Sequence, residues 1–276
     1  MRTTKPHREL QSKSKLSFKN AKDTARSPIV AQKLHKLLAR TGLGSRREME
    51  KLIAAGQVTI NKKTAGVADR ASKFDVVRIK KKIIHLNFGK EFPRVLLYHK
   101  LEGEIVSYND PNNRPSVFDK LPKLKTSKWV SVGRLDFNTC GLLIFTTDGA
   151  LANRLMHPRY EVEREYAVRI VGTLSLNQEK LLTKGIELGD GVAKFISLVD
   201  QGGKGTNHWY HVILKEGRNR EIRRMFEAIG ITVSRLIRVR FGIVKLPPRL
   251  RRGQLVELNN EEVEHIFSEY PNNIGI

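Results

Sequence analysis

The sequence predicts an α+β protein in two unequal parts, a small N-terminal module of two helices with short strands and a larger domain built on a sheet. Residues 33–39 and 46–55 carry apolar positions at helical spacing, separated by a glycine-containing break. From residue 94 onward, apolar or alternating segments typical of strands outnumber the helical ones. The length of 276 residues fits one large or two ordinary domains.

The composition indicates an anionic partner. The chain carries 51 Lys and Arg against 28 Asp and Glu, a formal net charge of +23 at pH 7. Such an excess is most typical of proteins that bind nucleic acid, with an anionic membrane surface as the alternative. We expect no membrane partner, because no segment approaches the ~18 apolar residues of a spanning helix and no secretory signal or lipidation motif is found. The single cysteine, Cys140, excludes an internal disulfide and suits the cytoplasm.

Three segments lack the pattern of a packed core. Residues 1–28 hold many basic and few apolar side chains, which favours a disordered arm. Such an arm is suited to lie along phosphates, and a role in solubility alone is the equal alternative. We expect a linker at 86–93 and a tail at 267–276.

Residues 29–85 form the small module. Ser45 and Glu48 have the spacing of a capping box, which predicts the start of the second helix. Strands are expected at 58–60 and 76–79. Basic residues surround the second helix and favour contact with a phosphate backbone, whereas a solvated helix surface is the alternative. These residues are Arg40, Arg46, Arg47 and Lys51.

Residues 33–48, followed by 55–61, resemble the S4 RNA-binding module, a small helix–turn–helix with a short sheet. The resemblance covers roughly residues 30–84. It implies that Arg46, Arg47 and Lys51 face structured RNA.

The larger domain, 94–266, is centred on a strand–loop–strand–helix segment at 129–156. One acid, Asp136, lies in the loop, two residues after Arg134. A lone carboxylate at the end of a buried strand is poorly explained by packing, which makes it a candidate functional acid; an Asp that only caps its own turn is the alternative. Neighbouring arginines should keep it ionised and suited to act as a nucleophile or base. Clusters with metal-ligand spacing are not found, and we expect no metal.

Arginines after residue 216 are expected to line a basic cleft. Helix 221–229 has one apolar face, and arginines near its start oppose the helix dipole, a local conflict that often marks a site. Strand 233–241 alternates, which predicts an apolar face and an arginine face, with a solvated edge strand as the alternative. A strand is also expected at 105–108, pairing back on 94–99. The arginines concerned are Arg218, Arg220, Arg223, Arg224, Arg238 and Arg240.

Residues 133–149 are similar to the signature of the RNA pseudouridine synthases, and further matches lie at 98–100, 164–166 and 216–224. The nearest subgroup modifies ribosomal RNA and carries an N-terminal S4 module. The resemblance extends over nearly the whole chain after the arm. It implies a catalytic domain with a central, mostly antiparallel mixed sheet flanked by helices.

The family resemblance also implies a reaction, the isomerisation of one uridine to pseudouridine without a cofactor, on a base flipped out of its stack. Asp136 would begin it by attacking C1′ or C6 or by abstracting the C2′ proton. Tyr166 would stack on the base and help to remove the C5 proton, while Arg223 would pair with Asp136. Arg134 would fill the gap left by the base, and Leu214 would pack under the uracil.

The expected substrate is a stem-loop of large-subunit (23S) rRNA near the peptidyl-transferase region, as free RNA or in a pre-ribosomal particle, and the expected state is a monomer. The same reaction on 16S rRNA and a non-catalytic RNA-binding assembly factor are the alternatives. Two positions depart from the family pattern: Leu101 replaces a common proline and Glu221 a common glutamine. We expect Glu221 to point away from Arg223.

Overall fold

The computed structural model describes residues 31–86, 88, 92–125 and 127–271. The basic arm expected at 1–28 lies outside these residues. So do residues 87 and 89–91 of the expected linker and residues 272–276 of the expected tail.

The N-terminal module consists of two short helices and small sheets. In chain order its elements are β1 (Gln32–Lys33), α1 (Leu34–Arg40), α2 (Arg46–Ala54), β2 (Val58–Ile60), β3 (Lys63–Thr64), β4 (Arg70–Ala71), β5 (Val77–Ile79) and β6 (Lys82–Ile84). Strands β3, β2, β5 and β6 form one antiparallel sheet in that order, and β1 pairs with β4. The predicted capping box is confirmed, because the Ser45 hydroxyl accepts a hydrogen bond from the backbone N–H of Glu48 and the Glu48 carboxylate accepts one from that of Ser45.

A separate core holds this module together. The helical spacing brings the leucines of α1 to one face, where they are fully buried against α2 and the inner face of the sheet. Each fully buried aliphatic side chain contributes roughly 1.5–3 kcal/mol. The principal members are Leu34, Leu37, Leu38, Met49, Ile53, Val58 and Val77.

The larger domain contains one extended sheet with helices on both faces. Its strands are β7 (Val95–Lys100), β8 (Val130–Val132), β9 (Cys140–Thr146), β10 (Arg164–Val171), β11 (Ile186–Leu188), β12 (Gly191–Ala193), β13 (Ser197–Lys204), β14 (Asn207–Leu214), β15 (Val233–Phe241), β16 (Val244–Lys245) and β17 (Leu255–Glu257). Its helices are α3 (Gly149–Met156), α4 (Leu176–Lys184), α5 (Glu221–Ala228) and α6 (Asn260–Glu269), with single 3-10 turns at Val117–Lys120 and Pro158–Tyr160.

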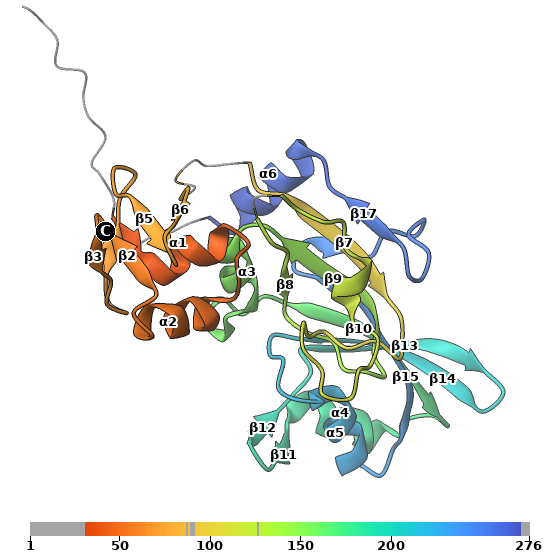
Figure 1. Ribbon diagram of the computed structural model, residues 1–276. Helices are drawn as coiled ribbons and strands as arrows, with labels where there is room; N and C mark the ends of the chain where they lie inside the picture. The colour runs from red at the N-terminus through yellow and green to blue at the C-terminus, as the bar shows by residue number, and fades with distance from the viewer. Residues whose placement is uncertain (1–30, 87, 89–91, 126, 272–276) are drawn as a thin grey trace, which may run out of the picture.

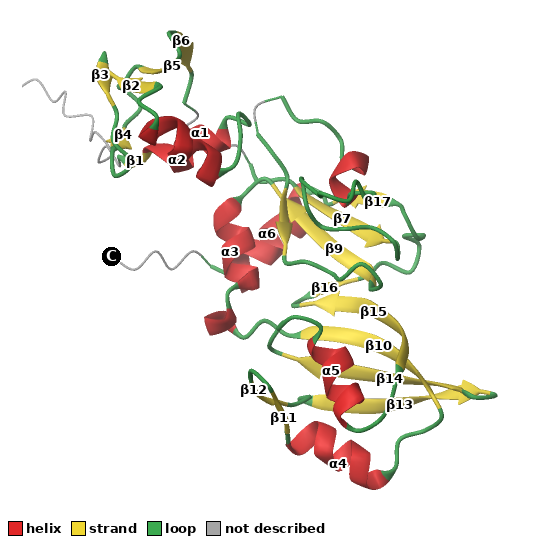
Figure 2. Cartoon of the chain, turned by 60° about the horizontal axis from the view of Figure 1, so that its bottom comes forward, coloured by secondary structure: helices red, strands yellow, loops and turns green. Residues whose placement is uncertain are grey.

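The sheet runs β13-β14-β10-β15-β9-β7-β17, with β8 added on β9 and β16 on β15, while β11 and β12 form a separate two-stranded sheet. Among the described residues, neighbouring strands of this sheet pair antiparallel, with the exception of β15 and β9, which are parallel. The predicted mixed, mostly antiparallel sheet flanked by helices is therefore confirmed. The N-terminal module stands beside α3 at one end of the domain, and α4 and α5 lie at the other end (Figures 1 and 2).

Both faces of the central strands are buried, which explains their continuous apolar sequence. On β9, Leu142 and Ile144 point to a core completed by α3 and α6. Leu143 and Phe145 point to the opposite core, completed by α4 and α5. The central loop before β9 is thus anchored in a strand that packs on two sides.

Strand β15 departs from the predicted alternation. Arg240 pairs with Glu165 and Arg238 with Tyr166, so Val239 is an extra residue at a register shift. This bulge turns both Arg238 and Phe241 inward, where they are buried. The prediction that Arg238 lies on a solvent-facing arginine face is therefore wrong.

Two further expectations are corrected. Residues 105–108 form no strand; Ile105 makes one bridge to Ser116, and the ring of Tyr108 stacks on Phe118 with centroids 3.7 Å apart. The tail expected from residue 267 begins later, because α6 continues to Glu269 and packs Phe267 on the core.

The parallel contact of β9 with β15 depends on Gly141. Its φ is +104°, and a Cβ there would lie 2.3 Å from the carbonyl oxygen of Arg238. A side chain at this position would therefore push the two strands apart, directly beside the loop that carries Asp136.

We predict that Gly141→Ala lowers the free energy of unfolding by at least about 3 kcal/mol, from strain and overlap together. Gly172→Ala is the matched control, since Gly172 also has a positive φ (+81°) but a Cβ there would meet no atom within 4 Å. That variant should lose only about 1 kcal/mol. Urea unfolding of both variants measures the difference, and equal losses would contradict a role for the close strand approach.

Candidate functional site

The loop between β8 and β9 carries the predicted acid. β8 ends at Val132 and Gly133 turns the chain with a φ of +76°. Arg134 is exposed, Leu135 is buried in the core, and Asp136 is half-buried. Within the described residues, the Asp136 carboxylate accepts no hydrogen bond and lies more than 4.0 Å from every cationic side-chain nitrogen. The carboxylate is therefore available to a ligand.

The backbone of this loop, in contrast, is held at every carbonyl from residue 136 to residue 139. The Asp136 and Thr139 carbonyls accept hydrogen bonds from the Lys100 ammonium, at 3.1 and 2.9 Å. The Phe137 carbonyl accepts one from the backbone N–H of Gly103 at 2.8 Å. The Asn138 carbonyl accepts one from Arg223 Nη2 at 2.8 Å. The acid thus projects from a backbone with little freedom to move.

Lys100 is the central donor. Its side chain is fully buried at the end of β7, and its third hydrogen bond goes to the Leu101 carbonyl at 2.8 Å. An ammonium has three N–H donors, and here each meets one carbonyl. Burial lowers the pKa of Lys100 to about 8, against the opposing effect of nearby acids such as Glu104.

Arg223 reaches the same loop from α5. Its Nη1 donates to the Val233 carbonyl at 2.8 Å, opposite its bond to Asn138. The expected ion pair is not formed, because among the described residues no Arg223 nitrogen lies within 4.0 Å of an Asp136 carboxylate oxygen. The guanidinium is buried and its fork is taken up by two backbone carbonyls, so it positions the loop instead. Burial lowers the pKa of Arg223.

Glu221 points away from Arg223, as expected. Its carboxylate is buried and accepts a hydrogen bond from the backbone N–H of Arg218 at 3.0 Å, which closes the turn before α5. Burial raises the pKa of Glu221. The replacement of glutamine therefore leaves the contacts of Arg223 to the loop intact.

Tyr166 and Leu214 lie on neighbouring strands. Tyr166 is on β10, opposite Val212 of β14 on one side and Arg238 of β15 on the other. Leu214 ends β14, two residues beyond Val212, and both predicted residues are nearly buried. The sheet thus places Tyr166 beside β15, which pairs with the start of β9 directly after the Asp136 loop.

The arginines expected to bind RNA fall into different groups. Arg238 does not qualify, since it is 2% exposed and donates Nε to the Leu142 carbonyl at 2.8 Å. Arg240, Arg224 and Arg218 are partly exposed but form ion pairs with Glu163 and Glu165, with Asp190, and with Glu216, respectively. Arg220 is exposed, with Glu227 at 3.6 Å. The remaining predicted residues are exposed: Arg134, Arg40, Arg46, Arg47 and Lys51.

Comparison with known proteins agrees with this architecture. Residues 94–228 match the family model for RNA pseudouridylate synthase, and residues 32–77 match that for the S4 domain. The chain is 51% identical over 240 residues to ribosomal large subunit pseudouridine synthase B of Escherichia coli K12, covering 86% of this chain and 82% of that protein. The chain belongs to the RNA pseudouridylate synthase family.

Two further comparisons support the assignment. The enzyme of the same name from Pseudomonas aeruginosa is 47% identical over 251 residues, covering 90% of this chain and 65% of that protein. A crystal structure described as a pseudouridylate synthase superposes with a TM-score of 0.58 at 25% identity, covering 84% of this chain and 98% of that one. The chain is thus an S4-containing pseudouridine synthase.

The S4 module of this synthase touches the catalytic domain through the turn between its two helices and the start of α2. The Lys128 ammonium donates to the Gly44 carbonyl, in the turn between α1 and α2, at 2.7 Å. A Cβ at Gly149, at the start of α3, would lie 3.7 Å from Arg46 Nη2. Arg46 therefore lies against the catalytic domain, although it remains exposed.

Sequence reasoning missed the side chains that hold the backbone of the Asp136 loop. In the sequence Lys100 is only one member of a motif and Arg223 one of several arginines, so neither stands out as a donor to these carbonyls. The available signal was a charged residue at the end of an apolar strand, at 95–100.

Across the residues that the structure covers, no group of three or more potential ligands could hold a metal ion, and no helix is long and apolar enough to cross a membrane.

We predict that Lys100→Met lowers the single-turnover rate about 100-fold at saturating RNA, because the loop loses the hydrogen bonds to its Asp136 and Thr139 carbonyls and the acid is misplaced. In the unchanged synthase the rate should fall as pH rises through about 8, since the neutral amine keeps two donors for three carbonyls. Unfolding would not explain this fall. The folded pKa lies below the ordinary 10.5, so deprotonation of Lys100 favours the fold as pH rises from 8 to 10.5.

Lys120→Met is the control for this experiment. Lys120 is exposed and forms an ion pair with Glu104, the acid whose charge opposes the lowering of the Lys100 pKa, but it makes no hydrogen bond to the loop. It should keep nearly the full rate and the same fall near pH 8. A fall near pH 8 that persists in Lys100→Met would assign the titration to another group.

Proposed function

We propose that this synthase isomerises one uridine of large-subunit rRNA to pseudouridine, and that Asp136 begins the reaction. The observation that carries the proposal is an unpaired, half-exposed carboxylate on a loop whose backbone is fixed at four carbonyls. The relatives named as large-subunit enzymes supply the substrate class.

The reaction exchanges one glycosidic bond for another. The N1–C1′ bond breaks, the uracil turns, and C5 bonds to C1′. C5 then loses its proton and N1 gains one, so the overall reaction is an isomerisation without an oxidant or reductant. An acid that starts this sequence must be ionised and must reach the sugar or the base. Asp136 can reach a substrate, because no side chain of the described residues forms a hydrogen bond or ion pair with its carboxylate.

The neighbouring residues suit the remaining roles. Tyr166 offers an aromatic surface beside β15 for the flipped base, and Leu214 offers an apolar contact on the next strand. Arg134 is exposed two residues before the acid, and no hydrogen bond or ion pair to another described residue holds it, so it is suited to fill the gap that the base leaves. Attack at C1′, attack at C6 and abstraction of the C2′ proton all fit this geometry.

We predict that Asp136→Asn abolishes pseudouridine formation, a loss of at least about 10⁴-fold, because the amide is neither a nucleophile nor a base. Affinity for rRNA and the melting temperature should stay near those of the unchanged protein, since the carboxylate makes no fixed contact with another described residue. Deproteinised 23S and 16S rRNA are assayed side by side by chemical mapping of pseudouridine. Conversion by the variant would refute the role of Asp136, whereas conversion of 16S alone would refute the substrate.

A further inference from the structure

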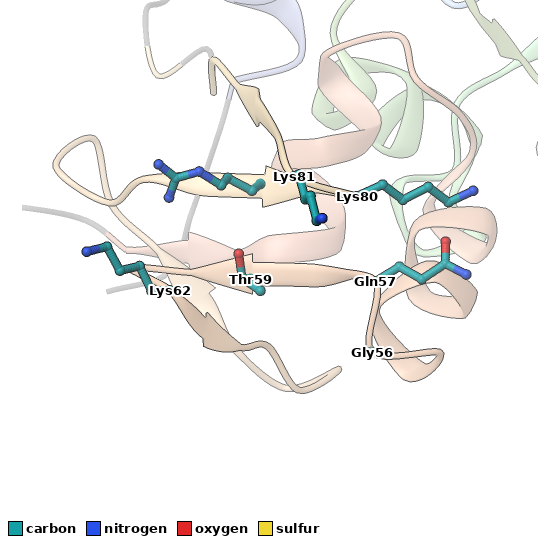
Figure 3. A pocket seen from close by; sticks show the side chains of 7 residues that line it. Gly56, Gln57, Thr59, Lys62, Lys80 and Lys81 are labelled. Carbon is teal, nitrogen blue, oxygen red and sulfur yellow. The ribbon is translucent and has the colours of Figure 1, made fainter.

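The outer face of the S4 sheet forms a basic groove that the catalytic domain leaves open. The sheet-face groove is defined by Gly56, Gln57, Thr59, Lys62, Arg78, Lys80 and Lys81, around a hollow of about 580 Å³. Figure 3 shows these side chains along two neighbouring strands, with Lys62 toward one end and Lys80 toward the other. No carboxylate is among the lining residues.

The pairing register explains why these residues share a face. Thr59 of β2 lies opposite Arg78 of β5. Their neighbours Val58 and Val77 are buried in the module core, so Thr59 and Arg78 point to the other side. The helices α1 and α2 cover the inner face and meet the catalytic domain, while β2, β3 and β5 lie on the side away from α3 (Figures 1 and 2).

The lysines at the ends of the groove occupy a backbone conformation that lysine rarely adopts. Each lies in a two-residue hairpin turn, Asn61-Lys62 between β2 and β3, or Lys80-Lys81 between β5 and β6. The φ angles are +49° and +71° in the first turn and +46° and +71° in the second. Both turns have the type I′ pattern, for which Asn-Gly is preferred. Lysine at these positions lowers stability, and local packing does not offset the loss, because all three side chains are exposed.

Their charges are also unpaired within the described part of the protein. Lys62, Arg78, Lys80 and Lys81 have no carboxylate oxygen within 4.0 Å of their cationic nitrogens. This differs from Arg218, Arg224 and Arg240 of the catalytic domain, which form ion pairs. A row of unpaired cations on an open sheet face matches the spaced charges of a phosphodiester backbone.

We propose that the sheet-face groove binds the phosphate backbone of an rRNA helix, as an RNA contact separate from the helix surface of Arg40, Arg46, Arg47 and Lys51. The inference rests on the proposed rRNA substrate. On this proposal, the two strained turns direct their lysine side chains toward the RNA. Because the contacts are to phosphates, the groove contributes affinity and orientation and no base specificity.

The turns allow a test in which stability and function move in opposite directions. Lys80→Asn with Lys81→Gly restores the preferred Asn-Gly turn and removes two charges. The full-length variant should melt at the same or a higher temperature. Its affinity for 23S rRNA and for a generic RNA duplex should fall roughly tenfold at about 0.1 M salt, and the slope of log affinity against log salt should decrease by about 1.8. Lys62→Gly should give half the change in slope.

Lys180→Gln with Lys184→Gln is the matched control, since it removes two exposed charges from α4 at the far end of the molecule. It should leave both the affinity and the slope nearly unchanged. Binding is measured in the Asp136→Asn background to prevent turnover. Equal slopes for the groove variant and the unchanged protein would overturn the proposal, as would equal losses in the groove and control variants.

Failure of the groove is distinguishable from failure of the proposed function. At saturating 23S rRNA, the unchanged protein and the Lys180→Gln with Lys184→Gln control, both with Asp136 intact, should convert uridine at the same single-turnover rate. Absence of conversion by the unchanged protein would refute the proposed function. The dependence of RNA affinity on salt tests only the groove.

Discussion

Four consecutive backbone carbonyls, from residue 136 to residue 139, each accept a hydrogen bond from a donor outside the loop. Two of the donors are buried cations, Lys100 from β7 and Arg223 from α5. Both cations donate their hydrogen bonds to backbone carbonyls. The Asp136 carboxylate therefore has no fixed partner among the described residues. The loop is therefore rigid while its acid is accessible, which is the combination that a preorganised catalytic group requires.

This arrangement carries a large desolvation cost, and the fold is built to support it. Removing an ammonium or guanidinium from water costs several kcal/mol, and hydrogen bonds from charged donors contribute roughly 1.5–3 kcal/mol each. Lys100 makes three such bonds and Arg223 two. The central strands bury both of their faces, so the donors start from immobile backbone. Gly141 lets β15 approach β9 directly after the loop.

The regular parts of the structure were predictable from sequence because local rules decide them. Leucine spacing gives α1, the Ser45–Glu48 pair gives the start of α2, and the apolar run at 142–145 gives a strand buried on both faces. The place of Asp136 on a loop between two strands was predictable for the same reason, since apolar segments flank it on both sides. The inward turn of Arg238 was not predictable, since the bulge at Val239 depends on the register with a distant strand. The predicted ion pair of Arg223 with Asp136 was wrong for a similar reason. Nothing in the local sequence shows that the carbonyls of Val233 and Asn138 accept the hydrogen bonds of its guanidinium.

The most direct test asks whether Lys100 and Arg223 act through the same loop. Single-turnover rates at saturating 23S rRNA are measured for Lys100→Met, Arg223→Met and the double variant. If both side chains act by holding one loop, the double variant should lose little more than the slower single variant, because the loop is already released. Losses that multiply would show that the two cations act independently, and would contradict the shared-tether account.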